Sequence, residues 1–235
     1  MIITIDGPAG AGKSSTARAV AERQSFRYLD TGALYRAVAL AFVDAGATPT
    51  NETAQALLDD CTIDLQFDDA DTLHVLMNSN EVTDTIRTSE VGDMASQVAA
   101  LPAVREALLP VQRQIATRWS QSTGGVVADG RDTGTVVFPH ADVKIFMEAS
   151  LEERARRRYE EYQTAPDGDP PSFASVREEI RQRDAHDRER DLAPLRRPDD
   201  AVSIDTTSMT FEEQVEAIEA LIEQANAGTD PFPSH

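Results

Sequence analysis

Short apolar runs recur along the chain, separated by stretches in which apolar residues fall at helical spacing. Five of these runs have the length of buried strands: Ile2 to Ile5, Phe26 to Leu29, Val126 to Ala128, Val143 to Met147 and Ala201 to Ile204. Strands that alternate with helices in this way are typical of a parallel sheet covered by helices on both faces. The pattern predicts a three-layer α/β fold with a central five-stranded parallel sheet, and its ligands should collect at the carboxyl ends of the strands.

One stretch follows a different period. Thr62 to Phe67 alternates apolar and polar residues, Asp68 to Asp71 have turn composition, and Leu73 to Met77 can pair with the first segment. Asn78 to Asn80 offers a second tight turn. These features predict a small antiparallel β insertion from Thr62 to Val82.

Helical spacing predicts the remaining elements. We expect helices at Ser15 to Gln24, Ser89 to Ala100, Ala103 to Trp119 and Thr210 to Ala225. Pro102 suits the first position of the third helix, and Pro110 should kink it. The proline-rich segment Gln163 to Ser172 has the composition of a mobile loop between two charged helices, and Gly228 to His235 that of a frayed tail.

Residues Gly7 to Ser14 match the phosphate-loop pattern G-x-x-x-x-G-K-[ST], directly after the first apolar run. A strand that leads into a glycine-rich turn and then a helix directs backbone N–H groups and the positive helix end at one point, where a polyphosphate can bind. Lys13 should reach the terminal phosphates, and Ser14 should complete the coordination of Mg²⁺. Lys13 and Lys144 are the only lysines among 22 basic residues, which indicates that a point charge is needed in the loop. The expected nucleotide-binding residues are Gly7, Pro8, Ala9, Gly10, Ala11, Gly12, Lys13, Ser14 and Ser15.

Composition narrows the class of protein. The chain has 235 residues, 40% of them apolar, which is enough for one substantial core, and no apolar run is long enough to span a membrane. The formal net charge of −19 argues against a nucleic-acid-binding surface. No signal peptide precedes the loop and Cys61 has no disulfide partner, so we expect a cytoplasmic protein. We hypothesise that the acidic surface reflects a high-salt cytoplasm, in which case activity and melting temperature should not both be highest at low ionic strength.

Polar segments follow two more of the predicted strands. Asp30 to Arg36 offers a helix cap and then an arginine one turn later, and Asp129 to Asp132 resembles the magnesium-associated strand end of phosphate-loop proteins. Two arginine clusters flank the proline-rich segment: Arg154, Arg156, Arg157 and Arg158 before it, and Arg181, Arg183, Arg188 and Arg190 after it. Mixed charge of this kind is most often a solvated helix face. Clusters on both sides of a mobile loop also fit a lid that closes arginines over a transferring phosphoryl group.

Taken together, these motifs and their order resemble the bacterial cytidylate kinases, within the nucleoside monophosphate kinases, over Ile2 to about Ala225. The most specific segments are Asp30 to Arg36, Ala95 to Ala99, Ala128 to Pro139 and Arg183 to Arg190. The resemblance implies that Ser96, Arg105 and Asp132 read the cytosine edge; Arg36, Arg131 and Arg190 hold the monophosphate; Thr31 and Tyr35 shape its pocket; and Arg183 and Asp187 contact the sugar. Asp129 joins this acceptor-binding set, and Lys13, Arg131, Arg154 and Arg157 would be catalytic. His186 and Pro110 depart from the family pattern.

The expected activity is therefore transfer of the ATP γ-phosphoryl group, as the magnesium complex, to CMP and dCMP by a monomeric enzyme that binds neither nucleic acid nor membrane. A kinase for UMP, dTMP or dephospho-coenzyme A remains open, as does a nucleotide-gated binding module. The expected division is a core of residues 1–35, 103–150 and 190–228, a monophosphate-binding insertion at 36–102, a lid at 151–189 and a flexible tail at 229–235.

Overall fold

The computed structural model describes residues 1–68, 72–164 and 171–228. The chain forms two compact units, one made of Met1–Leu29 with the chain from Thr123 onward and the other of Asp30–Ser122. Residues 69–71 of the predicted turn, residues 165–170 of the proline-rich segment and residues 229–235 of the predicted tail lie outside the described residues. The division into core, insertion and lid stays a prediction.

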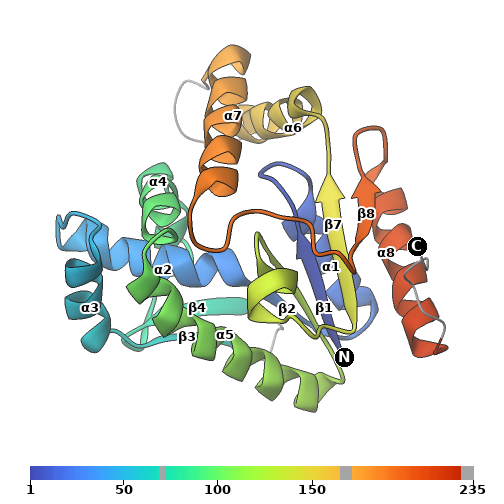
Figure 1. Cartoon of the computed structure of the whole chain (residues 1–235), viewed down its shortest axis with the longest axis horizontal. Helices are drawn as coiled ribbons and strands as arrows, with labels where there is room; N and C mark the ends of the chain where they lie inside the picture. The colour runs from blue at the N-terminus through green and yellow to red at the C-terminus, as the bar shows by residue number, and fades with distance from the viewer. Residues whose placement is uncertain (69–71, 165–170, 229–235) are drawn as a thin grey trace. The chain divides into compact units, whose positions relative to one another are not determined.

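A five-stranded sheet forms the centre of the first unit (Figure 1). Its order is β2 (Arg27–Asp30), β6 (Val126–Gly130), β1 (Ile2–Asp6), β7 (Val143–Glu148) and β8 (Val202–Asp205). β1 pairs in parallel with both β6 and β7, and β7 pairs in parallel with β8. The predicted five-stranded parallel sheet is confirmed.

The strands differ from their predicted bounds in a consistent way. Each strand ends one or two residues beyond its apolar run, because the sheet hydrogen bonds continue into a polar or glycine residue: Asp6, Asp30, Gly130, Glu148 and Asp205. Phe26 and Ala201, which we expected in strands, precede them. Polar residues at the carboxyl ends are therefore part of the sheet, which fixes their backbone positions.

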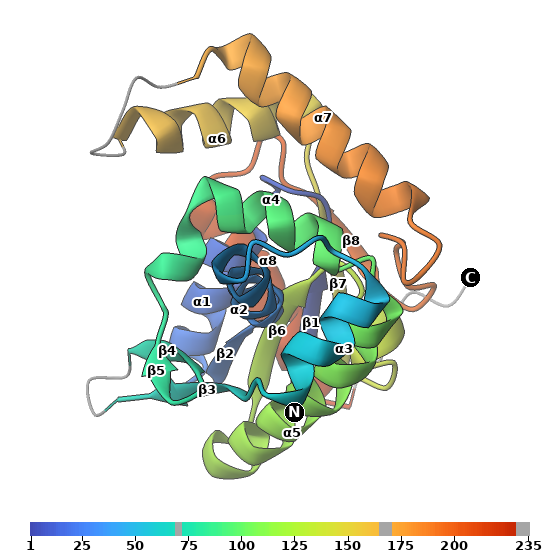
Figure 2. The same ribbon diagram turned by 90° about the vertical axis from the view of Figure 1, so that its left-hand side faces the viewer.

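Helices of the first unit fall into two groups. α1 (Lys13–Arg23) and α8 (Phe211–Asn226) pack against each other, α1 on β6 and α8 on β7. α1 begins two residues earlier than expected, since Gly12 is its N-cap with a φ of 93°. α6 (Leu151–Thr164) and α7 (Phe173–Glu189) pack side by side (Figure 2) around Ala155, Val176 and Ile180.

The second unit contains the antiparallel insertion and the helices around it. β3 (Ile63–Phe67) pairs with β4 (Leu73–Met77), which pairs with a two-residue strand, β5 (Asn80–Glu81). Asn78 and Ser79 have φ values of 50° and 64°, which suits a tight hairpin turn. The antiparallel insertion is confirmed, but Asn80, which we expected in the turn, belongs to β5.

Helices surround this insertion in the second unit. They are α2 (Thr31–Asp44), α3 (Asn51–Asp59), a 3-10 turn (Thr85–Arg87), α4 (Ser89–Val98) and α5 (Pro102–Thr123). α2 packs against α3 and α4. Pro102 is the first residue of α5, as predicted, and the helix continues past Pro110.

Candidate active site

The phosphate loop joins β1 to α1, and three of its glycines have backbone conformations that side chains rarely adopt. The φ angles are +146° at Gly7, +75° at Gly10 and +93° at Gly12. A Cβ on Gly7 would lie 2.0 Å from the carbonyl oxygen of Met147 in β7. The loop therefore requires glycine for both conformation and space.

The amino group of Lys13 lies inside the loop. Its Nζ donates to the carbonyl oxygen of Pro8 at 2.7 Å, and the residue is 5% exposed. Burial, and then the positive charge of Arg131, lower the pKa of Lys13 well below its ordinary value. Anions placed at the loop would favour the charged amine again.

Ser14 and Asp129 are brought into contact by the fold. The Ser14 Oγ donates to Asp129 Oδ2 at 2.6 Å, and the hydroxyl of Tyr28 donates to Asp129 Oδ1 at 2.9 Å. Magnesium prefers hydroxyl, carboxylate, water and phosphate oxygens, and typically takes one or two carboxylates from the protein. A hydroxyl and a carboxylate side by side at the phosphate loop fit such a site.

A cluster of opposite charges links the end of β6 with the end of α7. Arg131 Nε donates to Asp187 Oδ2 at 2.7 Å, and Arg190 lies 3.9 Å from the other oxygen of Asp187. Burial raises the pKa of Asp187, but the charge and hydrogen bond of Arg131 outweigh it, so the pKa is lowered. Arg183 lies one turn before Asp187 in α7 and lowers that pKa further. The segment thus presents several guanidinium groups around one carboxylate.

Arg154 connects the loop with the α6–α7 pair. Its guanidinium donates to the carbonyl oxygens of Ala149 and Ala9, both at 3.0 Å, and to Asp184 Oδ2 at 2.6 Å. Arg154 and Asp184 are both about nine-tenths or more buried, with side chains 5% and 6% exposed. A buried ion pair of this kind depends on both partners remaining in place.

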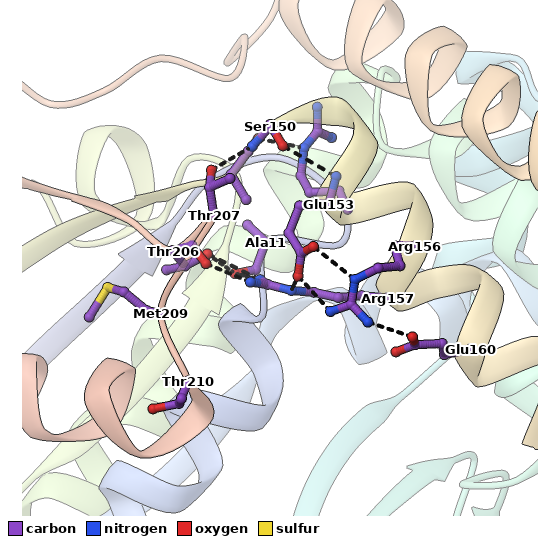
Figure 3. Close-up of polar contacts among 12 residues, drawn as sticks. Ala11, Ser150, Glu153, Arg156, Arg157, Glu160, Thr206, Thr207, Met209 and Thr210 are labelled. Atoms are coloured by element: carbon purple, nitrogen blue, oxygen red, sulfur yellow. Dashed lines mark hydrogen bonds and ion pairs between the residues drawn. The ribbon is translucent and has the colours of Figure 1, made fainter.

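Arg157 contacts the loop residue Ala11 and Thr206, which follows β8 (Figure 3). Its guanidinium donates to the Thr206 carbonyl oxygen at 2.6 Å, to the Thr206 hydroxyl at 3.1 Å and to the Ala11 carbonyl oxygen at 3.3 Å. Glu153 accepts from its Nε at 2.8 Å, and hydrogen bonds from Arg156 and Arg157 outweigh partial burial and lower the pKa of Glu153 to about 2.

The other arginines of α6 behave as the solvated-face interpretation predicts. Arg156 pairs with Glu153 and Glu160, and Arg158 pairs with Glu161. These are i,i+3 and i,i+4 pairs along one helix, with arginine side chains about half exposed. The charged run in α6 therefore has an outer face and an inner face, and Arg154 and Arg157 are on the inner one.

Five of the expected acceptor-binding residues belong to the second unit. Asp30 caps α2 by accepting from the Ala33 N–H at 2.9 Å, and Arg36 lies 4.0 Å from Asp30. The guanidinium of Arg105 lies 5.8 Å from the ring centre of Tyr35 and donates to the Ala99 carbonyl oxygen. Thr31 begins α2 and Ser96 lies on α4, which packs against α2.

Two residues that hold the segments around the phosphate loop were not predicted from the sequence. Asp6 is buried at the end of β1 and accepts three hydrogen bonds from Thr133 and Gly134. Thr206 follows β8 and binds both Arg157 and the loop carbonyl of Ala11. Each comes at or after the carboxyl end of a parallel strand, which is the signal that could have identified both.

Comparison with known proteins gives a consistent result. The "Cytidylate kinase" family model matches residues 3–224. A cytidylate kinase of Salinibacter ruber is 53% identical over 93% of this chain and 95% of its own length. One of Pseudomonas paraeruginosa is 51% identical over 92% of this chain and 93% of its own.

Among solved structures, a shikimate kinase from Bacteroides thetaiotaomicron is 12% identical, with a TM-score of 0.44 over 95% of this chain and 98% of its own. Within the described residues, no helix is long and apolar enough to cross a membrane. The phosphate loop, its partners and the match over almost the whole sequence lead to one conclusion: the chain belongs to the cytidylate kinase family.

Proposed function

We propose that this chain transfers the γ-phosphoryl group of ATP to CMP, and to dCMP as well. The observation that carries the proposal is the Arg131–Asp187–Arg190 cluster, which lies in the same unit as the phosphate loop. A loop for one polyphosphate and a separate set of guanidinium groups suit an enzyme with two anionic substrates. A nucleotide-gated binding module would have no use for the second set.

In the proposed mechanism, the backbone N–H groups of residues 10–13 bind the ATP phosphates, and Lys13 leaves the Pro8 carbonyl to reach the terminal phosphate. Ser14 and Asp129 would hold Mg²⁺, which neutralises charge on the phosphate oxygens when bound. Arg154 and Arg157, next to the loop, stabilise the transferring group. The CMP phosphate, with a second pKa of about 6, supplies the attacking oxygen itself, so no side-chain base is needed.

The finer part of the proposal concerns which residues recognise the acceptor. Arg36, Arg131 and Arg190 bind the acceptor phosphate. Thr31, Tyr35, Arg183, Asp187 and Asp129 complete its surroundings. The Asp132 carboxylate accepts from the exocyclic amine of cytosine, with Ser96 and Arg105 as further contacts. Uracil presents a carbonyl oxygen at that place. We therefore expect kcat/KM for UMP to be lower than that for CMP by at least about tenfold.

A coupled assay of ADP release tests the proposal directly. ATP is combined with CMP, dCMP, UMP, dTMP or dephospho-coenzyme A, at low and high salt. We expect fast turnover with CMP and dCMP alone. ATP consumption at the same rate with and without an acceptor would contradict the proposal. Faster turnover with another acceptor than with CMP would show that CMP is the wrong acceptor.

The two lysines provide a matched pair of variants. Lys13→Ala should lower kcat by roughly 100-fold or more and leave the fold intact, because the loop loses its charge to the phosphates. Lys144 is equally buried, but it binds the Pro139 carbonyl oxygen and Asp200, outside the phosphate loop. Lys144→Met should lower the melting temperature and retain kcat in the protein that remains folded. Near-normal turnover in Lys13→Ala would refute the assignment.

A further inference from the structure

Asp6 lies between the phosphate loop and the segment that follows β6. It is the last residue of β1, and Gly7 of the phosphate loop follows it directly. Its side chain is fully buried and points to the segment after β6, where the short π-helix Thr133–Val137 begins. π-Helical turns are rare and are frequent at functional sites.

Three hydrogen bonds join Asp6 to that segment. Oδ1 accepts from the Thr133 N–H at 2.9 Å and from the Thr133 hydroxyl at 2.7 Å. Oδ2 accepts from the Gly134 N–H at 2.7 Å. One carboxylate therefore fixes two successive backbone groups and a side chain, directly after Arg131 and Asp132.

The packing around Gly134 leaves little space for movement. A Cβ on Gly134 would lie 2.9 Å from the Thr4 hydroxyl oxygen, 3.2 Å from Pro198 Cγ and 3.3 Å from Asp6 Oδ2. The segment thus lies directly on β1, and the absence of a side chain allows the close approach. Any change in the Asp6 carboxylate must be transmitted to the backbone at 133–134.

Keeping a carboxylate in this place is unfavourable for the folded protein. Burial raises the pKa of Asp6 to about 6 although hydrogen bonds from Gly134 and Thr133 oppose it, and the nearby Asp132 carboxylate adds to the increase. Side chains whose environment destabilises the folded protein occur most often at functional sites.

We propose that Asp6 is a positioning residue for the acceptor: it fixes the segment Arg131–Gly134 relative to the first residue of the phosphate loop. The inference rests on the proposed function, in which Arg131 binds the acceptor phosphate and Asp132 the base. Asp6 reaches neither substrate and acts through the backbone at Thr133 and Gly134.

Substitution of Asp6 should raise KM for the acceptor more than KM for ATP, because other contacts hold the phosphate loop in place. Arg154 donates to the Ala9 carbonyl oxygen, and the Thr206 hydroxyl donates to the Ala11 carbonyl oxygen at 3.1 Å. None of these contacts involves Asp6. The segment at 133–134, in contrast, directs its hydroxyl and both N–H groups to Asp6.

Asp6→Asn tests the proposal with almost no change in volume. The amide oxygen can still accept from Thr133, but the NH₂ group then faces the Gly134 N–H, and two donors cannot bond. We expect KM for CMP to rise on the order of tenfold, as for loss of a hydrogen bond to a charged group, with KM for ATP changed less than about twofold. Thr133→Val, which removes only the hydroxyl donor, should give a smaller increase in the same direction.

Asp142→Asn is the matched control. Asp142 Oδ2 accepts from the Ile2 N–H at 2.6 Å, so it is an aspartate bound to the other end of the same strand. This variant should leave both KM values unchanged. Hydrogen exchange of the Gly134 amide in the nucleotide-free protein gives a second readout, and protection should be lost in Asp6→Asn and retained in Asp142→Asn.

The outcomes separate the inference from the proposed function. If the wild-type enzyme does not phosphorylate CMP, the proposed function is wrong. The contact of Asp6 with Thr133 and Gly134 is tested separately, by hydrogen exchange. A deprotected Gly134 amide with an unchanged KM for CMP would overturn the positioning role. An equal increase of both KM values would also overturn it, because Asp6 would then affect the binding of ATP as much as the binding of CMP. Retained protection of Gly134 would overturn it without reference to activity.

Discussion

Ionisation of Asp6 should destabilise the folded protein in a manner that depends on pH. Burial raises the pKa of this carboxyl from 3.8 to about 6. Between these values the folded chain binds more protons at Asp6 than the unfolded chain does, so the free energy of unfolding falls as pH rises. The stabilising contribution is fully present below pH 3.8 and is lost as pH increases through about 6.

The magnitude follows from the two pKa values. Their difference, about 6 minus 3.8, converted at 1.36 kcal/mol per pH unit, is about 3 kcal/mol. Because Asp6 is fully buried, solvent screening does not reduce this value. About 2 kcal/mol of it falls between pH 4.5 and 7.5, where a titration is practical.

The measurement compares the wild type with Asp6→Asn by urea denaturation across that range at constant ionic strength. Subtracting the variant removes the contribution of the other acidic groups, which both proteins share. Circular dichroism and fluorescence of Trp119 should be followed together, since a chain of two units need not unfold in a single step.

The wild-type free energy of unfolding should fall by about 2 kcal/mol relative to the variant from pH 4.5 to 7.5. A wild-type minus Asp6→Asn difference that is constant with pH, or that increases, would refute the reasoning from burial.

Two further pairs of substitutions test the loop and its partners. Asp184→Ala leaves the buried charge of Arg154 without its carboxylate and should lower the free energy of unfolding of the α6–α7 pair by about 3 kcal/mol, whereas Arg158→Ala removes a half-exposed pair and should change it little. Limited proteolysis in urea measures both, and equal effects would contradict the assigned burial. Gly7→Ala should abolish ATP binding, since its Cβ would lie 2.0 Å from a β7 carbonyl oxygen. Gly46→Ala, also at positive φ but with nothing within 4 Å, should keep binding in a calorimetric titration, and loss in both would point to backbone strain alone.

The sequence was sufficient for elements whose signal is local. Apolar runs located all five strands of the parallel sheet, and the alternation at 62–67 located the antiparallel insertion. The sequence associated Ser14 and the segment Asp129 to Asp132 each with magnesium, but the direct hydrogen bond between Ser14 and Asp129 was not predicted. The two-residue strand β5 and the π-helix were missed, because neither is long enough to show a period.

The arginines of α6 show what local sequence cannot predict, namely which face of a helix is buried. Four arginines within five positions fit a solvated face, yet Arg154 and Arg157 bind the loop and the other two pair outward. Spacing of three places Arg154 and Arg157 on one side of the helix, but which side faces inward depends on Ala9, Ala11 and Thr206, which are distant in sequence. Asp6 was overlooked for a similar reason, because its partners are more than 120 residues away.

Both lysine side chains of this chain are enclosed, Lys13 by the phosphate loop and Lys144 by Pro139 and Asp200. Each is 5% exposed, so the folded surface offers succinimidyl esters and similar acylating reagents almost no ε-amine. Crosslinking or immobilisation chemistry aimed at lysine should therefore fail on the native enzyme and succeed after unfolding. Acylation of Lys13 under native conditions would then report opening of the loop, and protection by ATP would give a chemical footprint of the nucleotide.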